Sequence, residues 1–481
     1  MSLALVWLRR DLRLADNPAL QAAIEAGHTP VPVYVHAPAE EAPWEPGAAT
    51  RWWLHHSLQA LAGELRALGS SLVLREGTTL DQLNQLIEAS GAVAVYWNRL
   101  YDPVLTRRDA DIKQALRARC VHVESFAAHL IAEPWEIRNL SGEPYRVFTP
   151  FWRTLKQRLP LPAPSPAPQN LPAHGLSGCE LAQFDLLPRI AWDLGLAQNW
   201  TPGTAGAEHA LRDFVEGALE DYAQGRDRPD RPGTSRLAPH LHFGEISPRQ
   251  LCQRLLQGAT PGQQERVEPW LRQLGWRDFG HHLLYHFPHT SEQPLQASFA
   301  QFDWAEVDSA KLHAWQRGRT GIPIVDAGMR ELWTTGWMHN RVRMIVASLL
   351  TKNLRQPWLA GARWFWDTLV DADLAANTLG WQWTAGCGAD AAPFFRIFNP
   401  VLQAERYDPA RVYIRRWLPE LTQLPDKWIQ RPWEAPAAVL AQAGVTLGQT
   451  YPHPIVELPA SRDAALAAYA TIRQPVAPTH A

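Results

Sequence analysis

Cysteine and long apolar runs are scarce in this sequence of 481 residues. Its four cysteines (Cys120, Cys179, Cys252 and Cys387) are widely spaced and form no CxxC pair, which argues against a disulfide framework or a zinc ribbon. No apolar run approaches the roughly 18 residues of a membrane-spanning helix. The start, MSLALVWLRRDLR, carries its charges after a very short apolar stretch, unlike a signal peptide. We therefore expect a cytoplasmic protein without membrane association.

The sequence also lacks an excess of charge of one sign, and it has little lysine. Its 46 basic and 48 acidic residues give a net charge of −2, and only 5 of the basic residues are lysine. A net charge this close to zero produces no strong overall electrostatic field, so it does not indicate a nucleic acid partner. Arginine suits phosphate contacts, but a GC-rich genome produces the same bias. Tryptophan, in contrast, is abundant, with 23 residues against 14 phenylalanines and 10 tyrosines.

The pattern of apolar residues divides the chain into three parts. Short β-branched runs predict strands over 3–8, 31–36, 71–75, 93–97 and 121–126, with amphipathic helices near 17–26, 50–68, 79–89 and 106–118. Strands that alternate with helices predict a five-stranded parallel, Rossmann-like sheet. A proline-dense stretch at 159–173 predicts an extended linker, and helical patterns follow at 211–224, 328–354 and 464–472. We expect an α/β domain over 1–135, a linker over 136–204 and an all-α domain over 205–475.

The α/β domain alone says little about chemistry. It has no GxGxxG after its first strand, so the dinucleotide fingerprint is absent. Arg9, Arg10 and Asp11 follow the first strand, at the edge where such sheets bind ligands. A solvated loop with a helix cap at Asp16 explains the same residues.

Polar clusters stand out in the helical part. Gly233, Thr234 and Ser235, followed by Arg236, offer N–H groups, hydroxyls and a charge that suit a diphosphate, although a capping turn explains them equally. The motif GWMHNRVRM (336–344) lies on a predicted long apolar helix, where buried arginines need a ligand or a carboxylate.

Helical spacing predicts which residues of two clusters lie on the same face of a helix. Asn340, Arg343 and Met344 share one helix face, and Asn377 precedes Trp381 by one turn. Asp371 and Asp373 are candidate carboxylates, and an ion pair of Asp371 with Arg343 is compatible with a ligand beside it.

Several long motifs resemble the photolyase and cryptochrome family. They are VWLRRDLRLADNPAL (6–20), FTPFWR (148–153), TSRLAPHLHFGEISPRQ (234–250), WRDF (276–279), TGIPIVDAGMRELWTTGWMHNRVRM (320–344), DADLAANTLGWQW (371–383) and FRIFNP (395–400). The resemblance covers nearly the whole chain, and it is strongest to the bacterial class I or class III cyclobutane pyrimidine dimer photolyases. It implies an α/β antenna domain and a helical domain that holds FAD, active in its reduced form.

The resemblance also assigns cofactor residues. The FAD-binding positions match Tyr222, Thr234, Ser235, Arg236, Leu237, Ala238, Arg343, Asp371, Ala372, Asp373 and Asn377. Asn377 matches the residue that faces flavin N5, where an amide accepts from N5–H. Trp381, Trp358 and Trp304 match the proximal, middle and distal members of an electron-transfer chain to the flavin. Indole suits this role because it is readily oxidised, although core packing is the default role of a tryptophan.

The same resemblance implies a pocket for a pyrimidine dimer flipped out of DNA. Trp276 and Trp383 match its aromatic walls, Asn340 a hydrogen-bonding residue and Met344 a neighbour of the dimer. Contacts to the DNA or the lesion match Arg226, Arg277 and Arg341. Segments 226–254 and 396–416 each carry a local excess of arginine, which gives salt-sensitive phosphate affinity or an ordinary solvated surface.

One position departs from the family pattern. Dimer photolyases usually carry Glu three residues before the pocket tryptophan, whereas this chain has Gln273, which cannot transfer a proton. Binding then survives while the yield of repair falls. Asn340 in place of His argues against the (6-4) branch. His282 and His286 form an HxxxH pair, but no third ligand is evident, so we expect a structural role and no metal.

The leading hypothesis is therefore light-driven repair of dimers in UV-damaged DNA by electron transfer from reduced FAD. The alternatives are a cryptochrome-like photoreceptor with little repair activity, which Gln273 favours, and a flavin oxidoreductase acting on metabolites. The chain ends soon after its last predicted helix, at 474–481, which argues against a signalling tail. For an antenna, methenyltetrahydrofolate is preferred to a deazaflavin, without assigned residues, and we expect a monomer.

Overall fold

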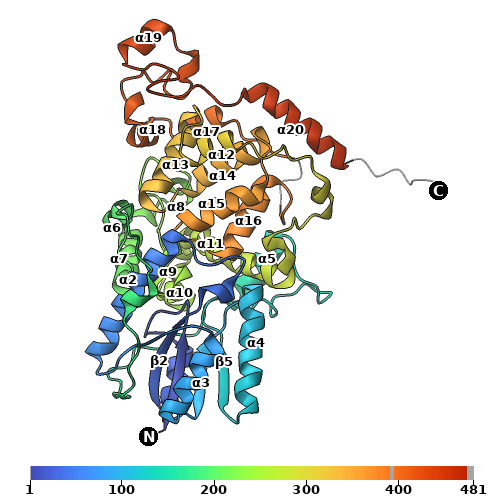
Figure 1. The fold of residues 1–481 in the computed structure, drawn as a ribbon. Helices are drawn as coiled ribbons and strands as arrows, with labels where there is room; N and C mark the ends of the chain where they lie inside the picture. The colour runs from blue at the N-terminus through green and yellow to red at the C-terminus, as the bar shows by residue number, and fades with distance from the viewer. Residues whose placement is uncertain (1, 391–394, 474–481) are drawn as a thin grey trace, which may run out of the picture. The chain divides into compact units, whose positions relative to one another are not determined.

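The computed structural model describes residues 2–390 and 395–473, and the tail at 474–481 lies outside them. Contacts divide the chain into two compact units. The first unit comprises Met1–Tyr222, Ser235–Pro288 and Val370–Ala375, and the second comprises Ala223–Thr234, His289–Leu369 and Ala376–Ala481. Figure 1 colours the elements along the chain from blue at the N-terminus to red at the C-terminus.

The first unit contains a parallel sheet of five strands in the order β3-β2-β1-β4-β5. The strands are β1 (Leu3–Leu8), β2 (Thr29–His36), β3 (Val73–Glu76), β4 (Ala94–Asn98) and β5 (His122–Phe126). In the register, Leu5 pairs with Val31 on one side and with Val95 on the other. All five strands lie within two residues of the predicted positions, and the predicted α/β fold is confirmed.

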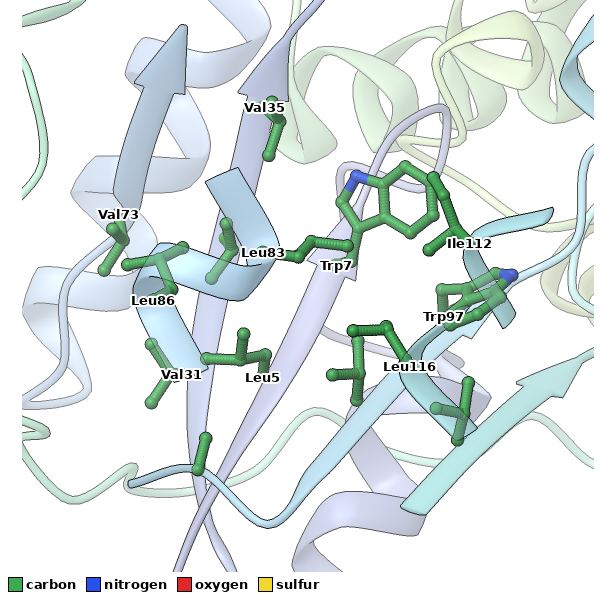
Figure 2. Packing of buried hydrophobic residues seen from close by; sticks show 14 residues of the cluster. Leu5, Trp7, Val31, Val35, Val73, Leu83, Leu86, Trp97, Ile112 and Leu116 are labelled. Atoms are coloured by element: carbon green, nitrogen blue, oxygen red, sulfur yellow. The ribbon is translucent and has the colours of Figure 1, made fainter. Parts of the chain in front are cut away.

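Apolar side chains fill the space between one sheet face and two helices. Leu5 and Trp7 of β1 point to the same side, because side chains of a strand alternate between faces. There they meet Leu83 of α3 and Ile112 of α4 (Figure 2). Trp7 and Trp97 make an edge-to-face contact at 5.4 Å between ring centroids. Residues on the opposite face of β1 are buried as well, which explains why the strand is almost uniformly apolar.

The helices of the first unit connect the strands and continue after the linker. They are α1 (Pro18–Glu25), α2 (Ala48–Ala67), α3 (Thr79–Ser90), α4 (Pro103–Ala118), α5 (Phe148–Leu155), α6 (Leu194–Asn199), α7 (Thr204–Asp213), α9 (Ala238–His242), α10 (Pro248–Leu256) and α11 (Pro261–His286). Asn17, not the predicted Asp16, caps α1, because its side chain accepts a hydrogen bond from the backbone N–H of Leu20. Residues 159–173 contain no helix or strand, as their prolines predict.

The second unit is helical, apart from one isolated bridge between Leu447 and Tyr451 among the described residues. Its helices are α12 (Ser309–Gln316), α13 (Pro323–Thr335), α14 (Asn340–Ser348), α15 (Trp358–Thr368), α17 (Pro400–Tyr407), α18 (Val412–Trp417), α19 (Ala437–Gln442) and α20 (Leu458–Arg473), together with most of α16 (Leu374–Ala385). The short helix α8 (Tyr222–Gly225) begins at the last residue of a segment of the first unit.

Two predicted helices are interrupted. The prediction of a continuous helix over 328–354 is wrong, because α13 ends at Thr335. Its cap residue Gly336 has a left-handed φ of 67°, and α14 begins after His339. His339 caps α14, since its ring nitrogen accepts from the backbone N–H of Arg341. The segment 211–224 is also broken: α7 gives way to a π-helical turn, η4 (Phe214–Ala218).

Candidate functional site

Asp373 lies at the centre of a buried polar cluster of the first unit. Its Oδ2 atom is 3.7 Å from Nδ1 of His242 and 3.5 Å from Nε2 of His281. Burial by itself raises the pKa of Asp373, but His281, His242 and Arg277 hold that pKa well below its usual range. The side chain is therefore an ionised acceptor in a dry environment.

Arg277 completes this cluster. Its Nη1 donates to the carbonyl of His129 at 2.5 Å, and its Nη2 lies 2.6 Å from Nε2 of His129. The ligand atoms of His129, His281 and Asp373 lie within 4.8 Å of one another, a spacing compatible with a metal ion. The guanidinium of Arg277 is a permanent cation in contact with His129, and its charge opposes the binding of a metal cation there. His129 and His281 are thus better suited to hold the carboxylate of Asp373 in place than to bind a metal together with it.

The HxxxH pair of α11 binds the backbone. Nδ1 of His282 and Nε2 of His286 lie 3.0 Å and 3.1 Å from the carbonyl oxygen of Pro134. Both rings therefore fasten the segment around Pro134 to α11, which is a structural role of the kind expected for this pair.

The turn around Gly233 is closed tightly. A Cβ atom at Gly233 would lie 2.3 Å from the carbonyl oxygen of Gly225, so no other residue fits there. Thr234 follows directly. In the first unit, Arg236 adopts a left-handed φ of 54°, and its guanidinium lies 4.1 Å from the ring centroid of Trp200. The turn thus presents consecutive hydroxyl and guanidinium groups from a strained backbone. Leu237 is buried behind them, and Ala238 begins α9.

Helix α16 carries three predicted site residues of the second unit, Asn377, Trp381 and Trp383. The Nδ2 of Asn377 donates to the carbonyl of Ala362 at 2.9 Å, which leaves Oδ1 as its acceptor. Trp381 is 2% exposed and packs against Phe365 of α15, with ring centroids 5.0 Å apart. Figure 1 shows α15 and α16 side by side.

The other two predicted electron carriers have separate surroundings. Trp358 is 5% exposed and begins α15, and Trp304 is partly exposed and packs on Phe302 at 4.6 Å. Within the described residues, neither ring contacts that of Trp381, whose aromatic neighbours are Trp315 and Phe365.

Helix α14 carries Asn340, Arg341 and Met344, which are predicted to contact the substrate, and Arg343, which is predicted to bind FAD. Asn340 is exposed at its first position, and Arg343 donates from Nε to the carbonyl of Met338 at 2.7 Å. Arg341 pairs with Asp227 at 2.8 Å, and its Nη1 lies 3.9 Å from the sulfur of Met344.

The remaining predicted residues lie in different places. Trp276 and Gln273 are partly exposed on α11, where Nε2 of Gln273 donates to the carbonyl of Pro269 at 3.1 Å. In the second unit, Nε1 of Trp383 donates to the carbonyl of Asp390 at 3.1 Å, and Arg226 is partly exposed. Tyr222, in the first unit, is 6% exposed.

Comparisons with known proteins decide the family. Residues 4–169 match the family model described as DNA photolyase, and residues 270–471 match the FAD binding domain of DNA photolyase. The chain is 47% identical to a deoxyribodipyrimidine photo-lyase of Agrobacterium fabrum over 98% of both chains. It is 41% identical to Cryptochrome-1 of Arabidopsis thaliana, covering 95% of this chain and 68% of that one. The chain belongs to the photolyase and cryptochrome family.

A solved structure supports the same conclusion. A bacterial class III photolyase from Agrobacterium tumefaciens superposes with a TM-score of 0.94 at 46% identity, over 99% of this chain and 98% of the other. The predicted family membership is therefore confirmed. None of the helices in the described part of the chain is long and apolar enough to cross a membrane.

The donor set fits the cofactor of a photolyase. Flavin and ribose offer N–H and O–H donors, which suit the ionised Asp373, and a diphosphate suits the groups of Thr234, Ser235 and Arg236. Sequence patterns did not reveal His129, His242 and His281, which surround Asp373. Only the position of His242 within the motif at 234–250 marked it in advance.

The family resemblance leaves the ligand edge of the sheet without an assigned role. Arg10 pairs with Asp102 at 2.6 Å and with Glu41 at 2.9 Å, and Arg9 pairs with Asp109 at 2.7 Å. Arg9 and Asp11 are buried, so the alternative of a solvated loop is wrong for these residues.

Proposed function

We propose that this protein is a class III deoxyribodipyrimidine photo-lyase, which uses light and reduced FAD to split cyclobutane pyrimidine dimers in DNA. One observation carries the proposal: Asn377, Trp381 and Trp383 all lie on one helix, α16, of a chain that matches a photolyase over 98% of its length. These three residue types serve flavin protonation, electron supply and base stacking.

The proposed cofactor is FAD. Tyr222, the run Thr234–Ala238, Arg343 and the run Asp371–Asp373 bind FAD, with the diphosphate on the hydroxyls and on Arg236. When bound and reduced, FAD supplies the electron that light excites. Oδ1 of Asn377 would accept the N5–H of the bound flavin, because Nδ2 of Asn377 already donates to the carbonyl of Ala362. Asp373 is kept ionised by its histidines and orients the cofactor.

The substrate is a dimer flipped out of DNA. Trp276 and Trp383 are the proposed stacking partners of its bases, and Asn340 and Met344 are further proposed contacts of the dimer. Arg226, Arg277 and Arg341 contact the DNA or the lesion. For Arg277 this contact competes with its hydrogen bonds to His129. Trp381, Trp358 and Trp304 would relay electrons from an external reductant inward to oxidised flavin and so restore its reduced form.

The test is illumination of the photoreduced protein with an oligonucleotide that contains one thymine dimer. Light-dependent loss of the dimer, measured by chromatography of the strand, is expected. An identical sample kept in the dark is the control. Bound flavin with no loss of dimer under blue light would contradict the proposal.

A cryptochrome-like photoreceptor is the second candidate, because Gln273 replaces the usual proton donor and plant cryptochromes are 41% identical to this chain. A photoreceptor would retain photoreduction while leaving the dimer intact. The same illumination experiment separates the two functions. A flavin oxidoreductase would instead bleach its flavin in the dark when a metabolite is added.

Three finer properties belong to the same proposal: an antenna, which we expect to be methenyltetrahydrofolate, a monomeric state and a cytoplasmic location. An absorption spectrum of the purified protein tests the antenna, because folate, deazaflavin and FAD absorb at different wavelengths. Light scattering tests the monomer, and cell fractionation tests the location.

A further inference from the structure

Phe148 covers one face of the Trp276 indole. The two rings are stacked, with centroids 3.7 Å apart and planes 9° from parallel. Phe148 lies at the start of α5 and is 1% exposed, whereas Trp276 is partly exposed on α11. The covered indole face is unavailable to any ligand. A base that stacks on Trp276 must therefore use the opposite face.

The surroundings of Phe148 hold its ring in this position. Phe279 meets it edge-on at 5.8 Å and also meets Trp276 edge-on at 5.8 Å, so the three rings form one cluster. The guanidinium of Arg272, one helical turn before Trp276, lies 5.3 Å from the Phe148 centroid. A buried ring with several partners is confined to one rotamer.

Close approach of α5 to α11 makes the stack possible. A Cβ atom at Gly275, the neighbour of Trp276, would lie 2.4 Å from Cε3 of Trp152 in α5. The Nε1 of Trp152 in turn donates to Glu268 of α11 at 3.0 Å. Glycine at 275 thus lets the helices meet at the distance that the stack requires.

We propose that Phe148 is a positioning residue for lesion recognition, which fixes the indole plane of Trp276 so that its free face is ready to receive a flipped-out pyrimidine dimer. This inference rests on the proposed function. A large side chain that is already ordered loses less conformational entropy when a ligand binds. Phe148 itself touches neither the dimer nor the flavin, and it acts through Trp276.

The test compares two truncations on the same helix. Phe148→Leu removes the stacked ring, and Phe151→Leu is its matched control. Phe151 is also 1% exposed on α5 and contacts Phe279 and His282, without a ring contact to Trp276. The measurements are the Kd values for an oligonucleotide with one thymine dimer and for its undamaged copy, the flavin content and the rate of photoreduction.

Phe148→Leu is expected to weaken dimer binding by about three- to tenfold, the cost of ordering one large side chain. Binding of undamaged DNA, flavin content and photoreduction stay at the wild-type values. Phe151→Leu retains the preference for the dimer. Equal losses in the two variants, or an unchanged preference in Phe148→Leu, would overturn the proposal.

A double-mutant cycle keeps the proposal testable if Phe148→Leu lowers the yield of folded protein. In a Trp276→Leu background, Phe148→Leu should have no further effect on the ratio of the two Kd values. Phe148→Tyr, which keeps the planar ring, should retain the wild-type ratio. Independent, additive losses would show a structural role alone. A wild-type protein without preference for the dimer would contradict the proposed function itself, a result distinct from any ranking of the variants.

Discussion

The ring of Trp381 packs directly against the backbone of Gly361. A Cβ atom at Gly361 would lie 2.0 Å from Cη2 of Trp381 and 2.7 Å from a methyl group of Leu350. Helix α15 therefore approaches α16 as closely as a helix without a side chain allows. Trp358 lies one turn before Gly361 on the same face of α15, because residues three apart are neighbours on a helix. Gly361 thus allows Trp381, the predicted proximal electron carrier, to pack against α15, the helix that begins with Trp358, the predicted middle carrier.

This contact predicts that Gly361→Ala moves Trp381. We expect a loss of stability of about 1–3 kcal/mol from overpacking, together with slower photoreduction of bound FAD. The matched control is Gly380→Ala on α16, where a Cβ atom meets nothing within 4 Å. That control should keep the wild-type photoreduction rate and stability, or gain about 0.5–1 kcal/mol. Equal photoreduction rates in both variants would show that the position of Trp381 does not matter.

Trp358→Phe tests the predicted electron path. Phenylalanine fills most of the space at this 5% exposed position but is far harder to oxidise than indole. We expect slow photoreduction at an unchanged flavin content, measured by absorbance under blue light in the presence of a reductant. Trp428→Phe, at a partly exposed residue of the second unit, is the control and should leave the rate unchanged. A wild-type rate in Trp358→Phe would remove Trp358 from the path.

Gln273→Glu tests the departure from the family pattern. A carboxyl group can transfer a proton and the amide cannot, so the yield of dimer repair per absorbed photon should rise. The affinity for the dimer should change little, because Gln273 already offers a donor and an acceptor. Gln264→Glu, an exposed position on the same helix, is the control. An unchanged yield would assign any weak repair to another residue.

The sequence predicted the sheet well, because strands buried on both faces are short, apolar and β-branched, and nothing else explains such runs. It missed the break after α13, since the apolar pattern continues in phase on both sides of Gly336 and hides the helix end. It also missed the histidines around Asp373. His242, His281 and Asp373 lie far apart in the chain, so no spacing rule connects them, and only the packing of α9 and α11 places their rings on one carboxylate.

Substitution of Arg341 tests its predicted contact with DNA. Its guanidinium pairs with Asp227 at 2.8 Å and lies 4.3 Å from the ring centroid of Tyr407, so a phosphate must compete with this carboxylate. Arg341→Gln should weaken binding of damaged and undamaged DNA alike and reduce the slope of log Kd against log salt by about one. Asp227→Asn should strengthen binding at low salt. Arg462→Gln, at an exposed pair on α20, should change neither, and an unchanged salt slope in Arg341→Gln would exclude the contact.

The buried carboxyl group of Asp278 leads us to expect that the free energy of unfolding depends on pH. Burial raises the pKa of this carboxyl to about 7, although Arg277 and the backbone N–H groups of Ala132 and Ile131 favour its ionised form. In the unfolded chain the pKa is about 3.9. The folded state therefore binds this proton more tightly, and the stabilisation is complete below about pH 4 and is lost as the pH rises through about 7.

Asp278→Asn removes this titration while keeping an oxygen for the backbone N–H groups of Ile131 and Ala132. The free energy of unfolding of the wild type, relative to this variant, should fall by roughly 2–3 kcal/mol between pH 5 and pH 7.5, since one pKa unit corresponds to about 1.4 kcal/mol. Urea unfolding at several pH values measures the difference. Because other groups titrate equally in both proteins, their contributions cancel. A flat difference for Asp278→Asn would mean that Asp278 is ionised in the folded protein throughout this range.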